Sequence, residues 1–483
     1  MAKLLRDIEE ADAWWSGDPD KLTDVYPTAA TREQRPGRRF WERPNDTTSV
    51  RPAERVHAPV ASDIAATGAD LLFGADLEVQ IPEAHGDHPD QAAVDAENRL
   101  AELWDQAAIS NTLLEAAEVA GGLGGVYLVP TWDREVAGHP LLNVVHADRA
   151  VPEWRGDRLH AVTFWHVVQV EGLNVWRHLE RHEPGAILHG LYAGSRTHLG
   201  VPMNLQKHPA TKGLPEVVPT TSWQVPGGIL ARYVPNVKPN RRHRGLPVGR
   251  SDTQGLESLM DSLDLTMTSW ARDIRLGQRR IIVPNEFLRR SGRGSGASFD
   301  VDQEVFSPLD IDPGNMEKAG ITLVDFSIRA DEHAATATDL FQRIVSSAGY
   351  SPQSFGMQGD GAAITATEVN AHESRSGRTT ARKQRYWGPE LAAAAVGLLI
   401  VDREVFSSGV APWRPTVGFP DRDQADEATV AQTLGLIEMA RAASIETKVR
   451  MLHPEWEQPQ VDAEVALIKA EQGVAVDPTG GFP

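Results

Sequence analysis

Two amphipathic segments separated by a short mixed module constrain the fold of this 483-residue chain most strongly. In the first, Ser251 to Ile274, apolar residues recur three or four apart, which predicts one apolar stripe along a helix of about six turns. Asp252 is placed to cap this helix and Gly277 to end it. The second segment, Asp331 to Ala348, carries a similar stripe, so each helix needs a packing partner.

The module between the two helices, residues 277–330, is small. Short β-favouring runs at Arg280–Val283 and Ile321–Phe326 flank a Gly-rich tract, Ser291–Gly296, which we expect to be a mobile loop. After the second helix comes the loop Phe355–Gly361, whose three glycines do not support regular structure. We expect two more helices after this loop, over Thr365–Trp387 and Glu390–Phe406.

The first fifty-five residues are rich in Pro, Arg, Asp and Trp and lack sustained periodicity. We interpret them as an arm held by Trp14, Trp15 and Trp41. Helical spacing then predicts helices over Val60–Phe73 and Ala96–Ala120. Five residues containing four glycines, Gly121 to Gly125, are expected to break the second helix before a short buried strand at Val126–Val129.

Turn residues separate the next strand-like runs, which predicts an antiparallel sheet and an α+β fold class. The runs are Leu141–His146, Ala161–Glu171, Asn174–Glu183 and Ala186–Tyr192. The segment Pro235–Arg250 is interpreted as a linker, and Pro415–Phe419 as a returning strand that completes the sheet. The tail, Asp421 to Gly473, is predicted to be helical in three pieces, with Ser444 and Pro454 as helix starts.

Composition excludes several classes of protein. Cysteine is absent, which rules out disulfides, thiol catalysis and cysteine-ligated metal. Forty-eight basic against sixty-seven acidic side chains leave a formal charge of −19, so the surface as a whole does not attract nucleic acid. The longest apolar run, Leu391–Val401, is too short to span a bilayer, and Met1–Trp15 lacks the apolar core of a secretory signal. We therefore expect a protein that stays inside a cell.

Sequence motifs for catalysis are missing. Neither the phosphate-binding GxxxxGK[ST] pattern nor the GxSxG elbow occurs, and Gly121–Gly125 does not fit the dinucleotide fingerprint. We assign no catalytic residue and expect no cofactor and no metal. One segment leaves an alternative open: on a strand, His178, Glu180 and His182 share one face, which permits a metal site but is more typical of a solvated sheet face.

Two basic features have two interpretations each. The run Arg241–Arg244 fits a solvated or ion-paired surface, or contact with a polyanion. Beyond the Gly loop, four arginines at helical spacing form what we call the arginine stripe, which fits salt bridges to Glu368 and Glu373, a contact with a neighbouring subunit, or contact with DNA phosphate. The stripe consists of Arg375, Arg378, Arg382 and Arg385.

Several strings, together with the order of elements, resemble the portal proteins, or head-to-tail connectors, of tailed double-stranded DNA bacteriophages. The most specific is Gly359–Glu368, a Gly-Asp-Gly loop running into Thr-Ala-Thr-Glu-Val at a helix start. This string lies within the longer segment Tyr350–Glu373, and weaker matches are His57–Gly74, Gly245–Asp264 and Ser444–Trp456. The arm before Arg55 and the tract at Ser291–Ser298 match least.

The resemblance implies a ring, usually of twelve subunits, at one vertex of the capsid, which serves as the channel for DNA packaging and ejection and has no ATPase of its own. It also implies a division of the chain. The parts would be an arm (1–55), a wing (56–250), stem helices (251–276 and 331–350) around a clip (277–330), a tunnel loop with a long helix and the completion of the wing (351–420), and a helical crown (421–483).

By the same resemblance, the tunnel loop would line the DNA channel and three clip arginines would form a docking surface. The loop residues are Gly356, Met357, Gln358, Gly359, Asp360 and Gly361, and the clip residues are Arg289, Arg290 and Arg293. The implied partners are further copies of the chain, the large terminase subunit, a head-tail adaptor, major capsid and scaffold proteins, and double-stranded DNA without sequence specificity, with no membrane.

The implied location is the portal vertex of the virion, after synthesis in the cytoplasm of a host bacterium. Two alternatives stay open at this point. The first is another structural virion protein, such as a capsid or adaptor protein. The second is a metal-dependent hydrolase that uses His178 and His182.

Overall fold

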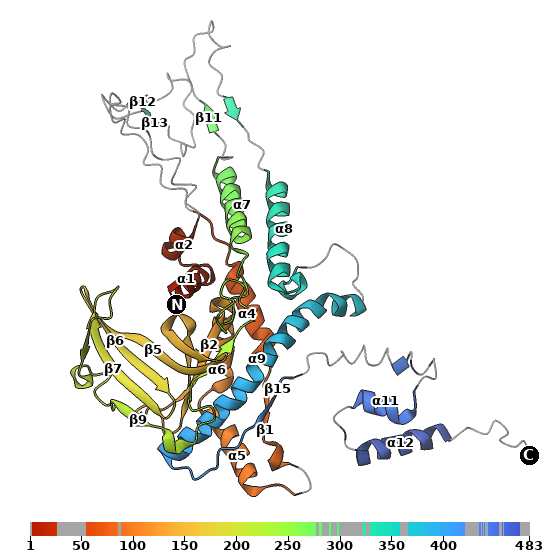
Figure 1. Cartoon of the computed structure of the whole chain (residues 1–483). Coiled ribbons are helices and arrows are strands. Elements are labelled where there is room, and N and C mark those ends of the chain that lie inside the picture. Colours follow the sequence, from red (N-terminus) through yellow and green to blue (C-terminus); the bar gives the residue numbers. More distant parts are fainter. Residues whose placement is uncertain are drawn as a thin grey trace, which may run out of the picture.

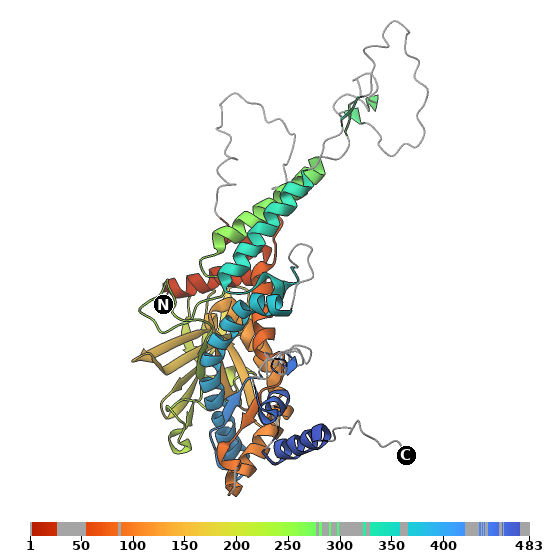
Figure 2. The ribbon, with the colours of Figure 1, turned by 90° about the vertical axis from the view of Figure 1, so that its right-hand side faces the viewer.

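The computed structural model describes residues 2–26, 55–85, 88–276, 329–357 and 366–420, with shorter stretches between 280 and 324 and between 434 and 473. Helices and antiparallel sheets make up these parts, which confirms the predicted α+β class. Two long helices, α7 and α8, stand side by side above a body of helices and strands (Figures 1 and 2).

The paired helices are α7, Glu257–Leu276, and α8, Ala330–Ala348. Their apolar stripes meet, and at the lower end Met260, Ile344 and Val345 are buried in one shared cluster. Both helices were predicted, but α7 begins at Glu257 rather than Ser251. Because residues 252–255 form a turn and Asp252 is buried, the expectation that Asp252 caps the helix is wrong.

The module between the paired helices contains the two predicted β runs. β11, Arg280–Ile282, pairs antiparallel with β14, Thr322–Val324. A second antiparallel pair joins β12, Arg289–Arg290, to β13, Ala297–Ser298. The Gly-rich tract 291–296 lies outside the described residues.

The amino-terminal residues do not form an irregular arm, so this prediction is wrong for residues 2–25. They form α1, Ala2–Ser16, and α2, Pro19–Val25. Leu4 and Ile8 on α1 are buried against the main core, and Trp14 reaches the cluster under the paired helices. The Pro- and Arg-rich composition of the following stretch, which includes Trp41 and lies outside the described residues, concealed these short helices in the sequence.

Three further helices surround this core. α4, Val60–Phe73, has the predicted bounds. The single helix predicted over Ala96–Ala120 is wrong, because a left-handed residue, Ala108 (φ 47°), separates α5, Gln91–Gln106, from α6, Ile109–Leu123.

The break expected at Gly121 occurs later, at Gly124 (φ 90°). α6 continues through Gly121 and Gly122, and a side chain at either position would collide with a neighbour. A Cβ on Gly121 would lie 3.2 Å from Cα of Ala65, and one on Gly122 would lie 2.7 Å from the ring of Trp15. These glycines serve close packing rather than helix termination.

The strands form two main antiparallel sheets. In the smaller one, β2, Gly125–Thr131, lies between β10, Arg232–Pro235, and β3, Leu141–His146. The larger one has the order β4-β5-β6-β7-β8, with β9 also pairing to β7. Its strands are β4 Ala150–Arg155, β5 Arg158–Glu171, β6 Asn174–Glu183, β7 Ala186–Gly194, β8 Val201–Met203 and β9 Val217–Pro219. Three of the four runs predicted to form one antiparallel sheet, β5, β6 and β7, are confirmed as neighbours, but the fourth, β3, pairs with β2 in the smaller sheet. The short strands β4, β8, β9 and β10 escaped prediction.

Short 3-10 turns connect several elements. They are η1 Pro82–Ala84, η2 Ala147–Arg149, η3 Leu205–Lys207, η4 Thr221–Trp223 and η7 Pro352–Phe355. The segment 235–250 is not a linker, because Asn236, Val237 and Val248 are buried. Asn240 donates a hydrogen bond to the carbonyl of Gly249 at 2.7 Å, so local contacts order this Pro-rich segment.

One helix, α9, Ala366–Phe406, replaces the two predicted after the Gly loop. It continues through Pro389 although an interior proline costs about 3 kcal/mol. Residues 391–401 beyond it are all buried, and this burial offsets the cost. The returning strand β15, Thr416–Gly418, is confirmed, but it pairs with β1, Glu78–Gln80, and therefore does not complete the large sheet.

Two helices are described in the tail, α11, Ile445–Leu452, and α12, Gln458–Gly473. Ser444 caps α11 as predicted, because its Oγ accepts a hydrogen bond from the backbone N–H of Thr447 at 3.2 Å. α12 begins at Gln458 rather than at Pro454, which lies outside the described residues. In the described part of the chain, no helix is long and apolar enough to span a membrane.

Candidate functional site

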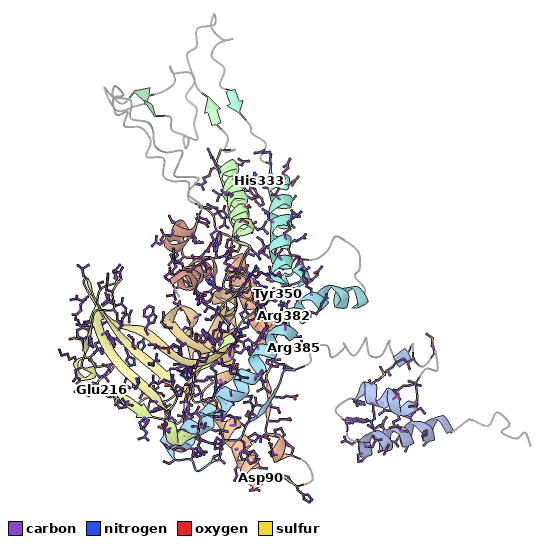
Figure 3. The ribbon with its side chains drawn as sticks, in the orientation of Figure 1. Asp90, Glu216, His333, Tyr350, Arg382 and Arg385 are labelled. Atoms are coloured by element: carbon purple, nitrogen blue, oxygen red, sulfur yellow. The ribbon has the colours of Figure 1, made fainter. Side chains whose placement is uncertain are left out.

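The body and the paired helices meet at a buried polar cluster that we call the Asp252 junction. It consists of Asn236 after β10, Asp252 before α7, Tyr350 after α8 and Lys383 in α9. Each of these four side chains is at most 3 % exposed. Figure 3 places Tyr350 at the point where α8 reaches α9. Elements far apart in the sequence are therefore joined through one carboxylate.

Asp252 accepts hydrogen bonds from the other three residues. Its Oδ2 lies 2.6 Å from Nζ of Lys383 and 3.3 Å from the hydroxyl of Tyr350, and its Oδ1 lies 2.9 Å from Nδ2 of Asn236. Burial, and then the charge of Asp252, hold the pKa of Tyr350 well above its usual range, so the phenol stays a donor. Removing one partner of a buried ion pair leaves the other charge uncompensated, which typically costs about 3–5 kcal/mol.

The junction requires a glycine on α4. A Cβ added to Gly68 would lie 2.5 Å from the hydroxyl of Tyr350 and 3.2 Å from Nζ of Lys383. No side chain fits there without displacing the donors of Asp252. At Gly68, α4 therefore packs against the junction through its backbone, without a side chain.

The base of the Gly loop is tied to α9 on the same side. Oγ of Ser376 accepts from the backbone N–H of Ser351 at 2.9 Å and lies 2.9 Å from Oγ of Ser354. Thr379 donates to the carbonyl of Gly349 at 2.6 Å. These contacts hold the chain that enters the loop against the helix that follows it.

Of the six loop residues singled out in the sequence, Gly356 and Met357 are described. Gly356 ends η7 in the left-handed region (φ 73°), a conformation that other residues rarely adopt. Gln358, Gly359, Asp360 and Gly361 lie outside the described residues, so their contact with DNA stays a prediction.

The arginine stripe lies on α9 and is exposed along its whole length. Figure 3 labels two of its members, Arg382 and Arg385, below Tyr350 on this helix. The side chains of Glu368 and Glu373 are outside the described part, so the predicted salt bridges to them stay a prediction. Within α9, Lys383 points to the junction while the arginines occupy the opposite side.

The run Arg241–Arg244 is ion-paired where the structure describes its contacts. Arg242 bonds to Glu10 at 3.1 Å and to Glu257 at 2.6 Å, and His243 lies 2.8 Å from Asp7. These contacts confirm the ion-paired interpretation for the two residues and fasten α1 to the start of α7.

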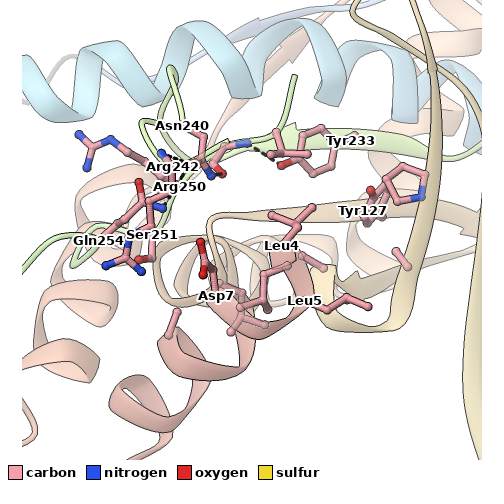
Figure 4. A pocket seen from close by; sticks show the side chains of 18 of the residues that line it. Leu4, Leu5, Asp7, Tyr127, Tyr233, Asn240, Arg242, Arg250, Ser251 and Gln254 are labelled. Carbon is pink, nitrogen blue, oxygen red and sulfur yellow. Dashed lines mark hydrogen bonds between the residues drawn. The ribbon is translucent and has the colours of Figure 1, made fainter. Parts of the chain in front are cut away.

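Arg242 also borders a small cavity under α1 (Figure 4). Leu4 and Asp7 of α1 face Ser251 across it. The cavity holds about 40 Å³, which is enough for a few water molecules but not for a metabolite.

Two of the three clip arginines belong to a strand that the structure describes. Arg289 and Arg290 lie in β12, where only the backbone pairing is described, and Arg293 lies outside the described residues. Their docking role stays a prediction.

Three histidines cross the large sheet in what we call the histidine row. Nδ1 of His178 lies 3.3 Å from Nε2 of His166, and its Nε2 lies 3.2 Å from Nδ1 of His189. On the same strand, Glu180 accepts a hydrogen bond from Nε2 of His182 at 2.6 Å. His178 is 3 % and His182 is 1 % exposed, so the expectation of a solvated sheet face is wrong.

Burial, followed by the neighbouring histidines, lowers the pKa of His178 to about 4. It also lowers the pKa of His166 and of His189. Burial would raise the pKa of Glu180, but the hydrogen bond from His182 and the nearby histidine charges lower it to about 2. The row is therefore neutral at pH 7. Among the described residues, no three ligand side chains converge as a metal site requires.

Sequence reasoning missed the Asp252 junction and a second network around Asp264. There, Asp264 accepts from the hydroxyl of Tyr26 at 2.6 Å, from Nδ1 of His57 at 2.9 Å and from the backbone N–H of Ala58 at 2.9 Å. The sequence held one signal for the junction. The chain has only nine lysines, and Lys383 is the single lysine of a helix that is otherwise rich in arginine.

The chain is similar to known proteins over most of its length. A model of the family "Phage portal protein, SPP1 Gp6-like" matches residues 5–472. Among solved structures, the chain is similar to one titled "Neck of empty GTA particle computed with C6 symmetry" (13 % identity, 81 % of this chain and 88 % of that chain, TM-score 0.38). It is also similar to one titled "Virion of native gene transfer agent (GTA) particle" (13 % identity, 83 % and 91 %, TM-score 0.38). No curated protein matches it at a significant level.

Because the family model covers nearly the whole chain, this chain belongs to the SPP1 Gp6-like phage portal proteins. The resemblance seen in the sequence is confirmed. The role of this chain is that of a phage portal, a structural protein that assembles into a ring of several subunits within a virion.

Proposed function

We propose that twelve copies of this chain form a ring at one capsid vertex through which the genome enters and leaves. The observation that carries the proposal is the Gly loop, which starts from a base tied to α8 and α9 at the end of the paired helices. α7 and α8 bury one stripe against each other, yet Leu265 remains 49 % and Ile274 48 % exposed. Apolar side chains left uncovered on a single copy favour burial against a neighbouring copy.

Particle shape and mass test the ring. Electron microscopy of concentrated protein, with mass from light scattering, is expected to show rings with a central hole at twelve times 52.8 kDa, about 630 kDa. A mixture with the phage scaffold protein serves as the positive condition if the isolated chain stays monomeric. A chain that stays near 53 kDa in both conditions would contradict the proposal.

In this proposal the loop residues from Gly356 to Gly361 surround the DNA. Glycine flanks let Met357 and Gln358 follow the passing duplex without a fixed hydrogen-bonding register. The double substitution Gly359→Ala/Gly361→Ala is expected to reduce the length of DNA packaged while rings form as before. Gly435→Ala, outside the loop, is the matched control. Unchanged packaged length would remove the role of the loop.

The remaining partners follow from the same proposal. The module at residues 277–330 would meet the large terminase subunit during packaging and the head-tail adaptor afterwards, with Arg289, Arg290 and Arg293 as contacts. The triple alanine variant of these arginines is expected to lose terminase binding in a pull-down by assembled rings. Retained binding would exclude this surface. Residues 421–483 would face the capsid interior, among the capsid and scaffold proteins.

A further inference from the structure

The arginine stripe on α9 is exposed on the surface of its own subunit. Arg375, Arg382 and Arg385 are exposed, and none of them forms an ion pair with a side chain that the structure describes. The stripe is centred roughly 140° around the helix from the buried face that carries Ser376 and Lys383, at about 100° per residue. These three guanidinium groups therefore face outward and are available for a contact outside the subunit.

An open groove of about 460 Å³ lies elsewhere on the same subunit, and we call it the Trp104 groove. β1 and the segment before it line one side, and α5 with the start of α6 lines the other. Its lining combines apolar side chains with two carboxylates. The residues used below are Leu77, Val79, Leu100, Trp104, Asp76 and Asp105.

The two carboxylates of the groove are also without partners. Asp76 and Asp105 are exposed, and neither makes an ion pair or hydrogen bond through its side chain with any residue in the described part of the chain. Glu102, one turn before Asp105 on α5, differs because Arg99 bonds to it at 2.8 Å. At this end of α5, Asp105 is thus the carboxylate that is left unpaired.

The chemistry of the groove suits a guanidinium group. A planar guanidinium stacks on an indole ring and forms paired hydrogen bonds with a carboxylate, and its apolar stem packs on aliphatic side chains. Trp104, Asp105 and Leu100 supply these three surfaces. DNA phosphate is a poor occupant because two carboxylates would repel it.

From these observations we propose that the Trp104 groove of one subunit receives the arginine stripe of the next subunit in the ring. The inference rests on the proposed ring. A closed ring needs two different, complementary patches on each copy, and three unpaired arginines on one patch with two unpaired carboxylates on the other meet that need. The partner is a second copy of this chain.

Charge reversal tests the pairing. Arg382→Glu or Asp105→Arg alone is expected to raise the protein concentration needed for ring formation about tenfold, which corresponds to about 1.4 kcal/mol. The double variant, Arg382→Glu/Asp105→Arg, restores opposite charges and is expected to recover most of that loss. Arg196→Glu and Glu216→Arg, exposed residues of the large sheet and its flanking loop, serve as matched controls. The two single variants change the net charge in opposite directions, so a loss in both of them cannot come from a general change of net charge.

Cross-linking gives an independent readout, because the chain contains no cysteine. Asp105→Cys/Arg382→Cys rings, treated with a short bismaleimide, are expected to yield a ladder of covalent oligomers, whereas each single variant stays monomeric. A bismaleimide is used because an arginine–carboxylate pair separates the Cα atoms by more than the roughly 4.4–6.8 Å that a disulfide spans.

The outcomes separate this inference from the proposed function. Asp105→Cys/Arg382→Cys rings that form normally but give no ladder, or single reversals that leave ring formation unchanged, would overturn the pairing and leave the portal ring intact. Reversals of Arg382 that spare rings but reduce packaged DNA would assign the stripe to DNA instead. Absence of rings in the wild type would contradict the proposed function itself.

Discussion

Two of the buried polar clusters in the described part of the molecule are stabilised in opposite ways. At the Asp252 junction, a carboxylate and an ammonium group attract each other, and Tyr350 and Asn236 satisfy the remaining oxygen sites. In the histidine row, three imidazoles share hydrogen bonds, and burial keeps them neutral. The junction therefore depends on both charges being present, whereas the row depends on an extra proton being absent.

This difference suits their places in the fold. The junction joins the body to the paired helices through three separate segments of the chain, so its loss affects all of them. The row lies within three neighbouring strands, where β5, β6 and β7 already hold one another by continuous backbone pairing. A fault in the row should weaken one sheet, while a fault at the junction should loosen the connection between the body and the helices that carry the module.

The largest effect is expected from breaking the ion pair. Lys383→Met should lower the free energy of unfolding by about 3–5 kcal/mol, because Asp252 stays buried without its counter-charge. The double variant Lys383→Met/Asp252→Leu should lose much less. Denaturant unfolding of the unassembled chain measures both, with Lys469→Met, an exposed lysine of α12, as the control. A loss under 1 kcal/mol for the single variant would show that the junction is not the stronger cluster.

Acidification is expected to destabilise the histidine row first. The pKa of His178 is about 4 in the folded chain and about 6.5 when unfolded, so between these values the unfolded state binds more protons. Stability is therefore lost as the pH falls from about 6.5 to about 4, by on the order of 2 kcal/mol after allowing for solvent screening. Glu180, with a folded pKa of about 2, adds a further loss as the pH falls from about 4.5 to about 2.

The groups that face His178 set this dependence. They are His166 on β5, His189 on β7, and Glu180 and His182 on β6, with Arg149 of η2 near His166. His178→Gln keeps a donor and an acceptor but does not titrate, so it should flatten the fall in melting temperature between pH 6.5 and 4. His198→Gln, on an exposed loop, should leave that fall unchanged. An equal slope in all three proteins would exclude His178 as its source.

The smallest effect concerns a third cluster, in which a tyrosine, a histidine and a backbone N–H contact one buried carboxylate. Tyr26→Phe removes one of three donors to Asp264 and should cost about 1.5 kcal/mol. The hydrogen bonds from Ala58 and His57 remain in this variant, and Tyr192→Phe, at the half-buried surface of β7, is the control. Thermal unfolding compares the two. Equal melting temperatures would mean that two donors suffice for Asp264.

The sequence predicted the apolar features of the fold better than the polar ones. The stripes of α7 and α8, the bounds of α4 and the strands β3 and β6 follow from periodicity, because helix and strand geometry repeat over neighbouring residues. The family was also recognisable from short strings such as Gly359–Glu368, and the family match confirms it. Boundaries failed where a distant contact overrode a local preference, as at Ala108 and at Pro389.

The sequence by itself determined the α+β class, the paired amphipathic helices around a small module, the Gly loop and membership of the portal family. Only the tertiary structure decided that Asp252 is an ion-pair partner rather than a helix cap and that His178 is buried rather than solvated. It also decided that Asp105 and three of the four stripe arginines have no ion-pair partner among the described residues of one subunit. The physical reason is range: periodicity records contacts between neighbours in the chain, whereas the environment of a charge depends on segments such as 252 and 383, which only folding brings together.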